Sequence, residues 1–326
     1  MDTVINWLSA AIVYGTVLAA PALGETINEK TGHLNLGVPG IMYLAGFISY
    51  YSVKMYLNTG SNNSFMIALI ALLSSFAIGA IFGLIYSVMC VTFKANQNVV
   101  GLAISAFGVG FGKFFSTMLD VGNEALTDAG AVFNTGIIGL RDIPYAGQLL
   151  FSHGFFTYMM LIILILAFFF FKKTRVGLNL RAIGESPAAA DSAGISITRY
   201  KYLATTIGCG FCGLGGMAYV FQFSSGNWGT NNNMETIGWL AIALVIFATW
   251  NSLNLIWCAP LFGFLYWAST YLQHIVDITF FSGMNQILQM LPYIVTILIL
   301  IINSLRRKKE SQPPSNLGLS YFREER

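Results

Sequence analysis

Apolar residues occupy nine long runs separated by short polar segments, and this alternation is the strongest pattern in the sequence. Roughly 20 apolar residues are needed for an α-helix to cross a bilayer, and most of the runs approach that length. They lack the period-two alternation that is typical of transmembrane β-strands. We therefore predict an all-α fold, a polytopic transmembrane helical bundle of about nine spans (about 8–10), with helices over residues 4–23, 41–56, 65–93, 99–115, 154–171, 202–223, 237–250, 255–272 and 287–305.

The composition excludes an ordinary soluble domain. Of the 326 residues, 56% are hydrophobic and 10% are charged, whereas a soluble domain has roughly 25% charged residues. Six of the 17 Lys and Arg residues lie in the central stretch 172–201, and six more follow Leu305. Basic residues at the ends of spans mark the cytoplasmic side of a membrane, so this clustering indicates topology rather than nucleic-acid binding.

The charge distribution therefore predicts that the central loop and the C-terminus are cytoplasmic. Four apolar runs separate the loop from the tail, an even number that agrees with this, and five runs precede the loop, which predicts an external N-terminus. One further half-buried segment within 24–40 or 116–150 would reverse the N-terminus. Segments 116–153 and 224–235 are then external. We expect residues 1–305 to form one transmembrane domain and residues 306–326 to form a basic, disordered cytoplasmic tail.

The central loop 172–201 contains the signals for a short helix. Ser186 can act as an N-cap followed by Pro187 at the first helical position, and Gly194 can end a helix over 188–193. Such a helix across the cytoplasmic mouth of the bundle is a docking point for a soluble partner. The alternative is a solvated connector that merely obeys the charge rule.

Segment 24–40 is polar and rich in glycine although it lies between two apolar runs; its polar residues include Glu25, Asn28, Glu29, His33 and Asn35. Polar backbone next to spans is tolerated where it is buried in protein or lines a watery cavity. We interpret the segment as a broken or re-entrant element on a transport path. The alternative is an ordinary loop before a helix that begins at Pro39.

Two further features allow two readings each. Asn96, Gln97 and Asn98 stand before the fourth apolar run, where they can line a pathway or simply cap the helix. The run 237–250 is only about 14 residues long and precedes a run that contains Pro260. That pair is either a broken helix at a binding site or two tilted helices joined by a tight turn.

Other candidate chemistries are excluded by position or spacing. Cys209 and Cys212 lie inside a predicted span, where small packing residues are expected rather than a redox pair. Gly108, Gly110 and Gly112 do not complete a phosphate-binding loop and instead predict close helix packing. The three histidines are scattered without metal-ligand spacing, so we expect neither a metal site nor a catalytic residue.

Three stretches resemble a known family. Residues 181–220, RAIGESPAAADSAGISITRYKYLATTIGCGFCGLGGMAYV, resemble the coupling region of permease subunits of bacterial ABC importers for ribose, branched-chain amino acids and nucleosides. Residues 24–47, GETINEKTGHLNLGVPGIMYLAGF, resemble the nucleoside subgroup, which works with a substrate-binding lipoprotein of the basic-membrane-protein type. Residues 238–253 are similar to a third block of that subgroup, with Ala248 and Ser252 in place of its usual Gly and Pro.

The resemblance implies a permease subunit in a bacterial cell membrane that forms half of a pore with a second, non-identical permease. A cytoplasmic ABC ATPase would dock on the short helix and use ATP and Mg, so no cofactor is expected in this chain, and an external binding protein would deliver substrate. For coupling to the ATPase we select Arg181, Gly184, Glu185, Ala188 and Gly194.

The cargo implied by the resemblance is a nucleoside, which is neutral and has many hydrogen-bonding edges that amide side chains suit. For the substrate pathway we select Asn28, Asn35, Asn96, Gln97 and Asn98. A simple sugar, a flavin or a branched-chain amino acid remains an alternative cargo. A channel would need no ATPase-docking loop, and a membrane-embedded enzyme would need clustered ionisable groups.

Overall fold

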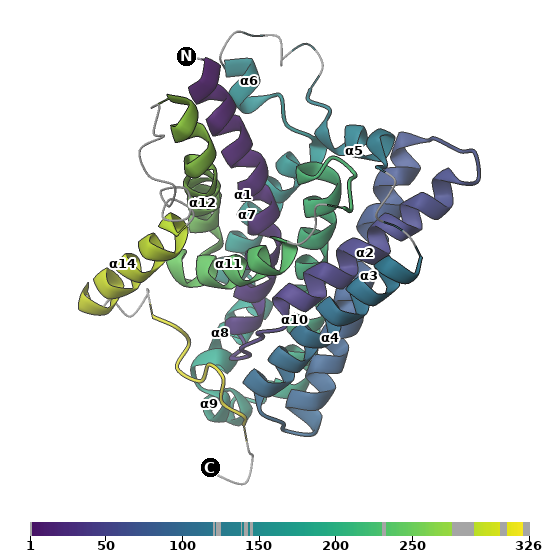
Figure 1. Cartoon of the computed structure of the whole chain (residues 1–326). Helices are drawn as coiled ribbons and strands as arrows, with labels where there is room; N and C mark the ends of the chain where they lie inside the picture. Colours follow the sequence, from purple (N-terminus) through teal and green to yellow (C-terminus); the bar gives the residue numbers. More distant parts are fainter. Residues whose placement is uncertain are drawn as a thin grey trace.

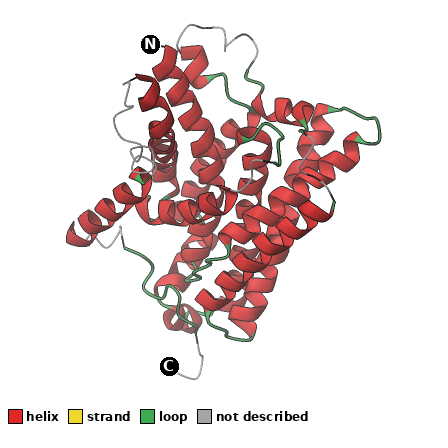
Figure 2. Cartoon of the chain, viewed as in Figure 1, coloured by secondary structure: helices red, strands yellow, loops and turns green. Residues whose placement is uncertain are grey.

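The computed structural model describes residues 2–119, 121, 125–137, 139, 143, 146–229, 233–275, 290–306 and 312–321. These residues form an all-helical bundle without a strand, apart from one isolated bridge between Ala125 and Asn227 (Figure 2). The helices are α1 Asp2–Glu29, α2 Val38–Leu57, α3 Ser64–Ser87, α4 Gln97–Met118, α5 Thr127–Asn134, α6 Ala146–Leu150, α7 Phe155–Lys173, α8 Arg175–Glu185, α9 Pro187–Ser192, α10 Ile197–Ala218, α11 Met234–Phe247, α12 Ser252–Ile275 and α14 Leu291–Arg306. Single π-helical stretches, Val88–Thr92 and Tyr219–Phe223, extend α3 and α10.

Each apolar run that the pattern marks coincides largely with one helix, so the predicted all-α membrane bundle is confirmed. Five helical stretches of the described chain are long and apolar enough to cross a membrane: Thr3–Glu29, Ser64–Thr92, Gln97–Met118, Phe155–Lys173 and Ile197–Phe223. Met234–Phe247 and Ser252–Ala268 are shorter apolar helices. Helix α11, at about 1.5 Å per residue, is therefore about 21 Å long and falls short of a full crossing.

Small residues let α10 pack at the centre of the bundle against α1, α2 and α3 (Figure 1). A Cβ atom on Gly208 would come within 2.6 Å of the Gly24 carbonyl oxygen of α1, and one on Gly83 of α3 would come within 2.7 Å of the Thr205 carbonyl oxygen. Cys209 and Cys212 are buried in the same interfaces as free thiols, as predicted. Close backbone approach at small residues is the main way helices associate in lipid, and it explains why this run is so rich in glycine.

Large apolar side chains are exposed along α3, α4 and α7, as the surface of a membrane protein requires. They include Leu69, Leu73, Phe107, Leu166 and Phe169. In water such a surface would cause aggregation. In a bilayer it faces lipid or another apolar helix.

The bundle has two distinct ends (Figure 1). The N-terminus, α5 and α6 lie at one end, where the Leu126 amide also bonds the Gly226 carbonyl and so joins the two segments predicted to be external. Helices α8 and α9 and the C-terminal segment lie at the other. The described part of the chain therefore places the central loop and the tail on the same side, opposite the N-terminus.

Two expectations about boundaries are corrected. Helix α1 does not end at Leu23 but continues to Glu29, because Thr26 and Asn28 bond within the helix, to the Ala22 carbonyl at 2.7 Å and to Glu25 at 2.8 Å. The tail is not disordered throughout, since residues 312–321, called below the C-terminal strap, pack against α8, α9 and the loop after α1. Residues 307–311 and 322–326 of the predicted tail lie outside the described residues.

Candidate functional site

Helices α8 and α9 form the core of the central loop, and their caps follow the predicted signals. Thr174 caps α8 by accepting a bond from the Gly177 amide at 3.0 Å. The Ser186 hydroxyl accepts from the Ala189 amide at 3.4 Å, and Pro187 is the first residue of α9. Gly194 has φ +77°, the left-handed conformation that ends a helix and that glycine adopts without strain. The short-helix prediction is therefore confirmed.

The residues selected for coupling lie together on this element. Arg181, Glu185, Ala188 and Gly194 are exposed, whereas Gly184 is buried at the end of α8. A side chain on Gly184 would collide with the Lys30 carbonyl oxygen, so α8 touches the end of α1 directly. The exposed α8–α9 pair is therefore in backbone contact, through Gly184, with the residue that follows α1.

The polar residues at the end of α1 are fully buried and form a hydrogen-bond network with the loop that follows. The Glu25 carboxylate accepts bonds from the Asn28 side chain and from the Asn35 backbone amide, both at 2.8 Å. Asn35 in turn accepts from the Gly37 amide at 2.9 Å and donates to the Cys209 sulfur at 3.2 Å. These bonds hold the loop 30–37 against α10 and leave the Asn28 Oδ1 atom without a hydrogen bond.

A second buried carboxylate connects this loop to the turn between α11 and α12. The Trp250 indole N–H donates to Glu29, and both residues are buried. Thr249 and Trp250 adopt φ of +53° and +54°, a left-handed conformation that costs free energy in residues with side chains. The tight-turn reading of this region is therefore confirmed. The turn's geometry also aims the indole at Glu29.

Two basic side chains of the loop are affected by burial. His33 lies 2.7 Å from the Thr205 hydroxyl, and its pKa is held well below the usual value by burial and then by the nearby Lys201 charge. Burial, followed by the Arg181 charge, lowers the pKa of Lys30 to about 8. His33 is therefore a neutral hydrogen-bonding group at physiological pH, and Lys30 loses its charge progressively as the pH rises through about 8.

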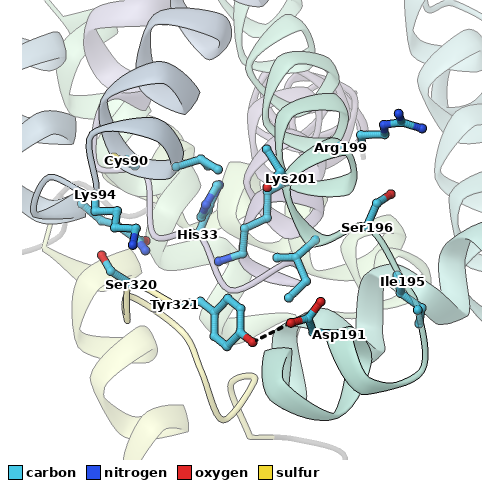
Figure 3. A pocket seen from close by; sticks show the side chains of 15 residues that line it. His33, Cys90, Lys94, Asp191, Ile195, Ser196, Arg199, Lys201, Ser320 and Tyr321 are labelled. Carbon is cyan, nitrogen blue, oxygen red and sulfur yellow. Dashed lines mark hydrogen bonds between the residues drawn. The ribbon is translucent and has the colours of Figure 1, made fainter. Parts of the chain in front are cut away.

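A cavity of about 630 Å³ opens beside α9. Its walls come from the start of α10, the turn before α4, the loop after α1 and the strap, and they include Lys94, Gln97, Asp191, Lys201 and Tyr321. Lys201 is only 4% exposed. In Figure 3 its side chain extends toward His33 and Tyr321, whereas Arg199 points away from them. The cavity is large enough for a small polar solute.

Comparison with known proteins identifies the family to which this chain belongs. The model of the family described as "Branched-chain amino acid transport system / permease component" matches residues 5–301. The chain belongs to this permease family. It is a transport subunit rather than an enzyme, it is a multi-pass membrane protein, and permeases of this kind work with an ATPase and a substrate-binding protein.

Three relatives align with most of this permease. The guanosine ABC transporter permease protein NupQ of Bacillus subtilis is 32% identical over 297 residues, which are 89% of either chain. The putative glucose ABC transporter permease protein TsgC13 of Haloferax volcanii is 30% identical over 81% of this chain and 77% of its own. The nucleoside ABC transporter permease protein NupC of Lactococcus lactis is 28% identical over 89% of this chain and 90% of its own.

The permease places its five predicted pathway residues in different settings. Asn28 and Asn35 are buried in the loop network, away from the cavity walls. Asn96 caps α4 by accepting from the amides of Asn98 and Val99, at 3.0 and 3.2 Å, so the capping reading is confirmed. Of the five, Gln97 lines the cavity.

Three features of the site were not selected from the sequence. The strap was taken as disorder, and Lys201 was counted only as one more basic residue of the loop. Trp250 lies inside the third block of resemblance, so the pattern marked its neighbourhood. Its contact with Glu29, 221 positions away, could not be seen.

Proposed function

We propose that this permease is the membrane subunit of an ATP-driven importer of nucleosides. The observation that carries the proposal is its similarity, over about nine-tenths of the chain, to two permeases named for guanosine and nucleoside transport. The Gln97 amide at the wall of the cavity beside α9 suits a neutral cargo with several hydrogen-bonding edges.

A second cargo is supported by one observation. The relative named as a putative glucose permease is 30% identical, a value between those of the two relatives named for guanosine and nucleoside transport, 32% and 28%. A sugar also presents hydroxyl donors and acceptors that amides can bind. A flavin or a branched-chain amino acid requires the same coupling element and a different pathway.

We propose that coupling to the ATPase acts through the exposed α8–α9 pair. An ATPase dimer that closes on ATP would press on α9 near Glu185 and Ala188, with Arg181 and Gly194 at the edges of the contact. Gly184 lies against the Lys30 carbonyl, so the displacement would reach α1 and its buried network and rock the bundle between outward- and inward-open states. ATP and Mg would be bound by the ATPase.

We extend the proposal to the orientation in the membrane, the partners and the pathway residues. The end of the bundle that carries α8, α9 and the strap would be cytoplasmic, with the N-terminus outside, because the central loop 172–201 carries six basic residues. A second, non-identical permease would complete the pore, and a substrate-binding lipoprotein would dock on the α5–α6 end. Gln97 would lie nearest the route of the cargo, with Asn96 and Asn98 at the entrance of α4 and Asn28 and Asn35 supporting the loop.

The test is uptake of labelled guanosine, uridine and glucose by bacterial cells with and without this chain, in a background that lacks other nucleoside carriers. Loss of ATP-dependent guanosine or uridine uptake on deletion, restored by the intact gene, is the expected result. Unchanged nucleoside uptake together with lost glucose uptake would replace the nucleoside with a sugar. No change for any of the three would reject both cargoes.

A further inference from the structure

The C-terminal strap, residues 312–321, lies along the coupling element rather than away from it. In Figure 1 its yellow trace passes beside α8 and α9. Its first contact is at the end of α8, where the Asn316 amide donates to the Gly184 carbonyl at 3.0 Å. Carbonyls in the last turn of a helix have no partner within the helix, so a passing amide satisfies one of them.

The Glu185 side chain is held by the same part of the strap. The Ser315 hydroxyl donates to the Glu185 carboxylate at 2.9 Å, and the Ser315 amide approaches the same oxygen at 3.4 Å. Pro314 is buried, and a side chain on Gly184 would lie 3.3 Å from its Cβ atom. Gly184 is therefore enclosed between the Lys30 carbonyl on one side and the strap on the other.

The middle of the strap reaches the loop after α1. The Gly318 amide donates to the Gly32 carbonyl at 3.1 Å, and Gly318 has φ +78°, which glycine adopts readily. Gln97 donates to the Leu319 carbonyl at 3.3 Å while its side-chain oxygen accepts from the Leu34 amide at 2.9 Å. One glutamine thus joins the strap, the loop and the start of α4.

The far end of the strap returns to α9. The Tyr321 hydroxyl donates to the Asp191 carboxylate at 3.1 Å, as drawn in Figure 3. The tyrosine ring packs beside a small apolar cluster of Ile183, Ala190 and Ile197, which joins α8, α9 and α10. An isolated helix as short as α9 is unstable in water, so these tertiary contacts fix its position.

We propose that the strap is a coupling element, in which Ser315 and Tyr321 are positioning residues that make α8, α9 and the loop 30–37 move as one body. The inference rests on the proposed function, since it concerns how the displacement of α9 is transmitted. Without the strap, α8 keeps its contact with the Lys30 carbonyl, and α9 keeps the apolar cluster that joins it to α8 and α10. It loses the hydrogen bond between Asp191 and Tyr321. A displacement of α9 by the ATPase is then transmitted only partly, because α9 can move relative to α8 and the loop 30–37.

The test uses the complete transporter, with its ATPase and binding protein, in proteoliposomes. Ser315→Ala and Tyr321→Phe each delete one hydroxyl and keep the backbone contacts and most of the packing. Leu319→Ala is the matched control, because that side chain is 58% exposed and the hydrogen bonds of Leu319 are made by its backbone, which the substitution keeps. The measurement is the ratio of cargo imported to ATP hydrolysed, with the amount of assembled complex recorded in parallel.

For the double variant S315A/Y321F we expect this ratio to fall about threefold to tenfold, with assembly unchanged. The two lost hydrogen bonds, both exposed or only partly buried, together correspond to a change of about that size in the docking equilibrium of the strap. A purely structural role would lower the amount of complex and leave the ratio intact. A wild-type ratio in the double variant with intact assembly would overturn the proposal.

Hydrogen exchange of the same variants separates this inference from the proposed cargo. The amides of Asn316 and Gly318 should be protected in the wild type, and in S315A/Y321F they should exchange faster, together with the loop 30–37. If this change occurs while the wild-type complex imports no nucleoside, the cargo is wrong and the strap remains a coupling element. If exchange in the loop is unaffected by the double variant, the strap does not hold the loop and the inference fails.

Discussion

Two glycines of α4 give a direct test of the helix packing, because they share a helix and differ only in their neighbours. Gly110 is exposed and has nothing within 4 Å of the position where a Cβ atom would stand. Gly108 is buried, and its Cβ would lie 2.7 Å from the Cα atom of Gly40 at the start of α2. Gly40 faces α4 reciprocally, since its own Cβ would lie 2.6 Å from the Ser105 Cα atom.

The magnitudes follow from these contacts. Replacing a glycine inside a helix with alanine stabilises the helix by about 0.5–1 kcal/mol, and Gly110→Ala should show this gain. Gly108→Ala has the same gain, but the new methyl group meets backbone that cannot rotate away, and overpacking of this kind costs about 1–3 kcal/mol. The two variants should therefore differ in unfolding free energy by about 1–3 kcal/mol, with G108A the less stable.

The assay is thermal unfolding of the purified chain in detergent, followed by tryptophan fluorescence at one fixed heating rate, because membrane proteins often unfold irreversibly. In a chain of this size 1 kcal/mol shifts the midpoint by about 2 °C, so we expect G108A to unfold about 2–6 °C below G110A. Equal midpoints for the two variants would refute the close contact between α2 and α4. A higher midpoint for G108A would refute it as well.

Three further predictions concern the site. Trp250→Phe should lower the free energy of unfolding by about 1–3 kcal/mol, because it removes the indole N–H that donates to the buried Glu29 carboxyl. Trp257→Phe, at a side chain that is 79% exposed, should have almost no effect, and equal losses for the two variants would contradict the Glu29 contact. Lys30→Gln should remove a pH dependence of the free energy of unfolding. The folded pKa of Lys30, about 8, lies below the unfolded value of about 10.4. Burial of the charged amine therefore destabilises the wild type below pH 8, and this cost fades as pH rises. The wild type should therefore gain stability relative to the variant between about pH 8 and pH 10, and a constant gap in unfolding midpoint over that range would count against the prediction. Glu185→Arg should reduce ATP-driven uptake at least about tenfold in the reconstituted complex while the chain stays folded. Ser61→Arg, at the opposite end of the bundle, is the control, and uptake at the wild-type rate in Glu185→Arg would reject the coupling assignment.

Local chemistry made several features predictable. The cap at Ser186, the proline after it and the glycine at 194 mark the two ends of α9 in the sequence, because capping depends only on neighbouring residues. The position of Asn96 directly before an apolar run likewise predicts its role as the N-cap of α4. The end of α1 was mistaken because its polar residues were read as a loop signal, whereas Asn28 bonds one helical turn back to Glu25 and the protein around it excludes water.

The sequence by itself determined the helical class, the apolar runs, the placement of the basic loop and tail on one side, and the family resemblance. Lipid imposes the first three of these features residue by residue, through hydrophobicity, charge and the need to satisfy every backbone group locally. Only the tertiary structure decided that Glu29 meets Trp250, that Gly184 is enclosed between the Lys30 carbonyl and Pro314, and that a polar, proline-containing tail packs on the coupling helices. Those contacts join residues more than 100 positions apart, and no local pattern encodes them, because their free energy appears only when distant segments are brought together.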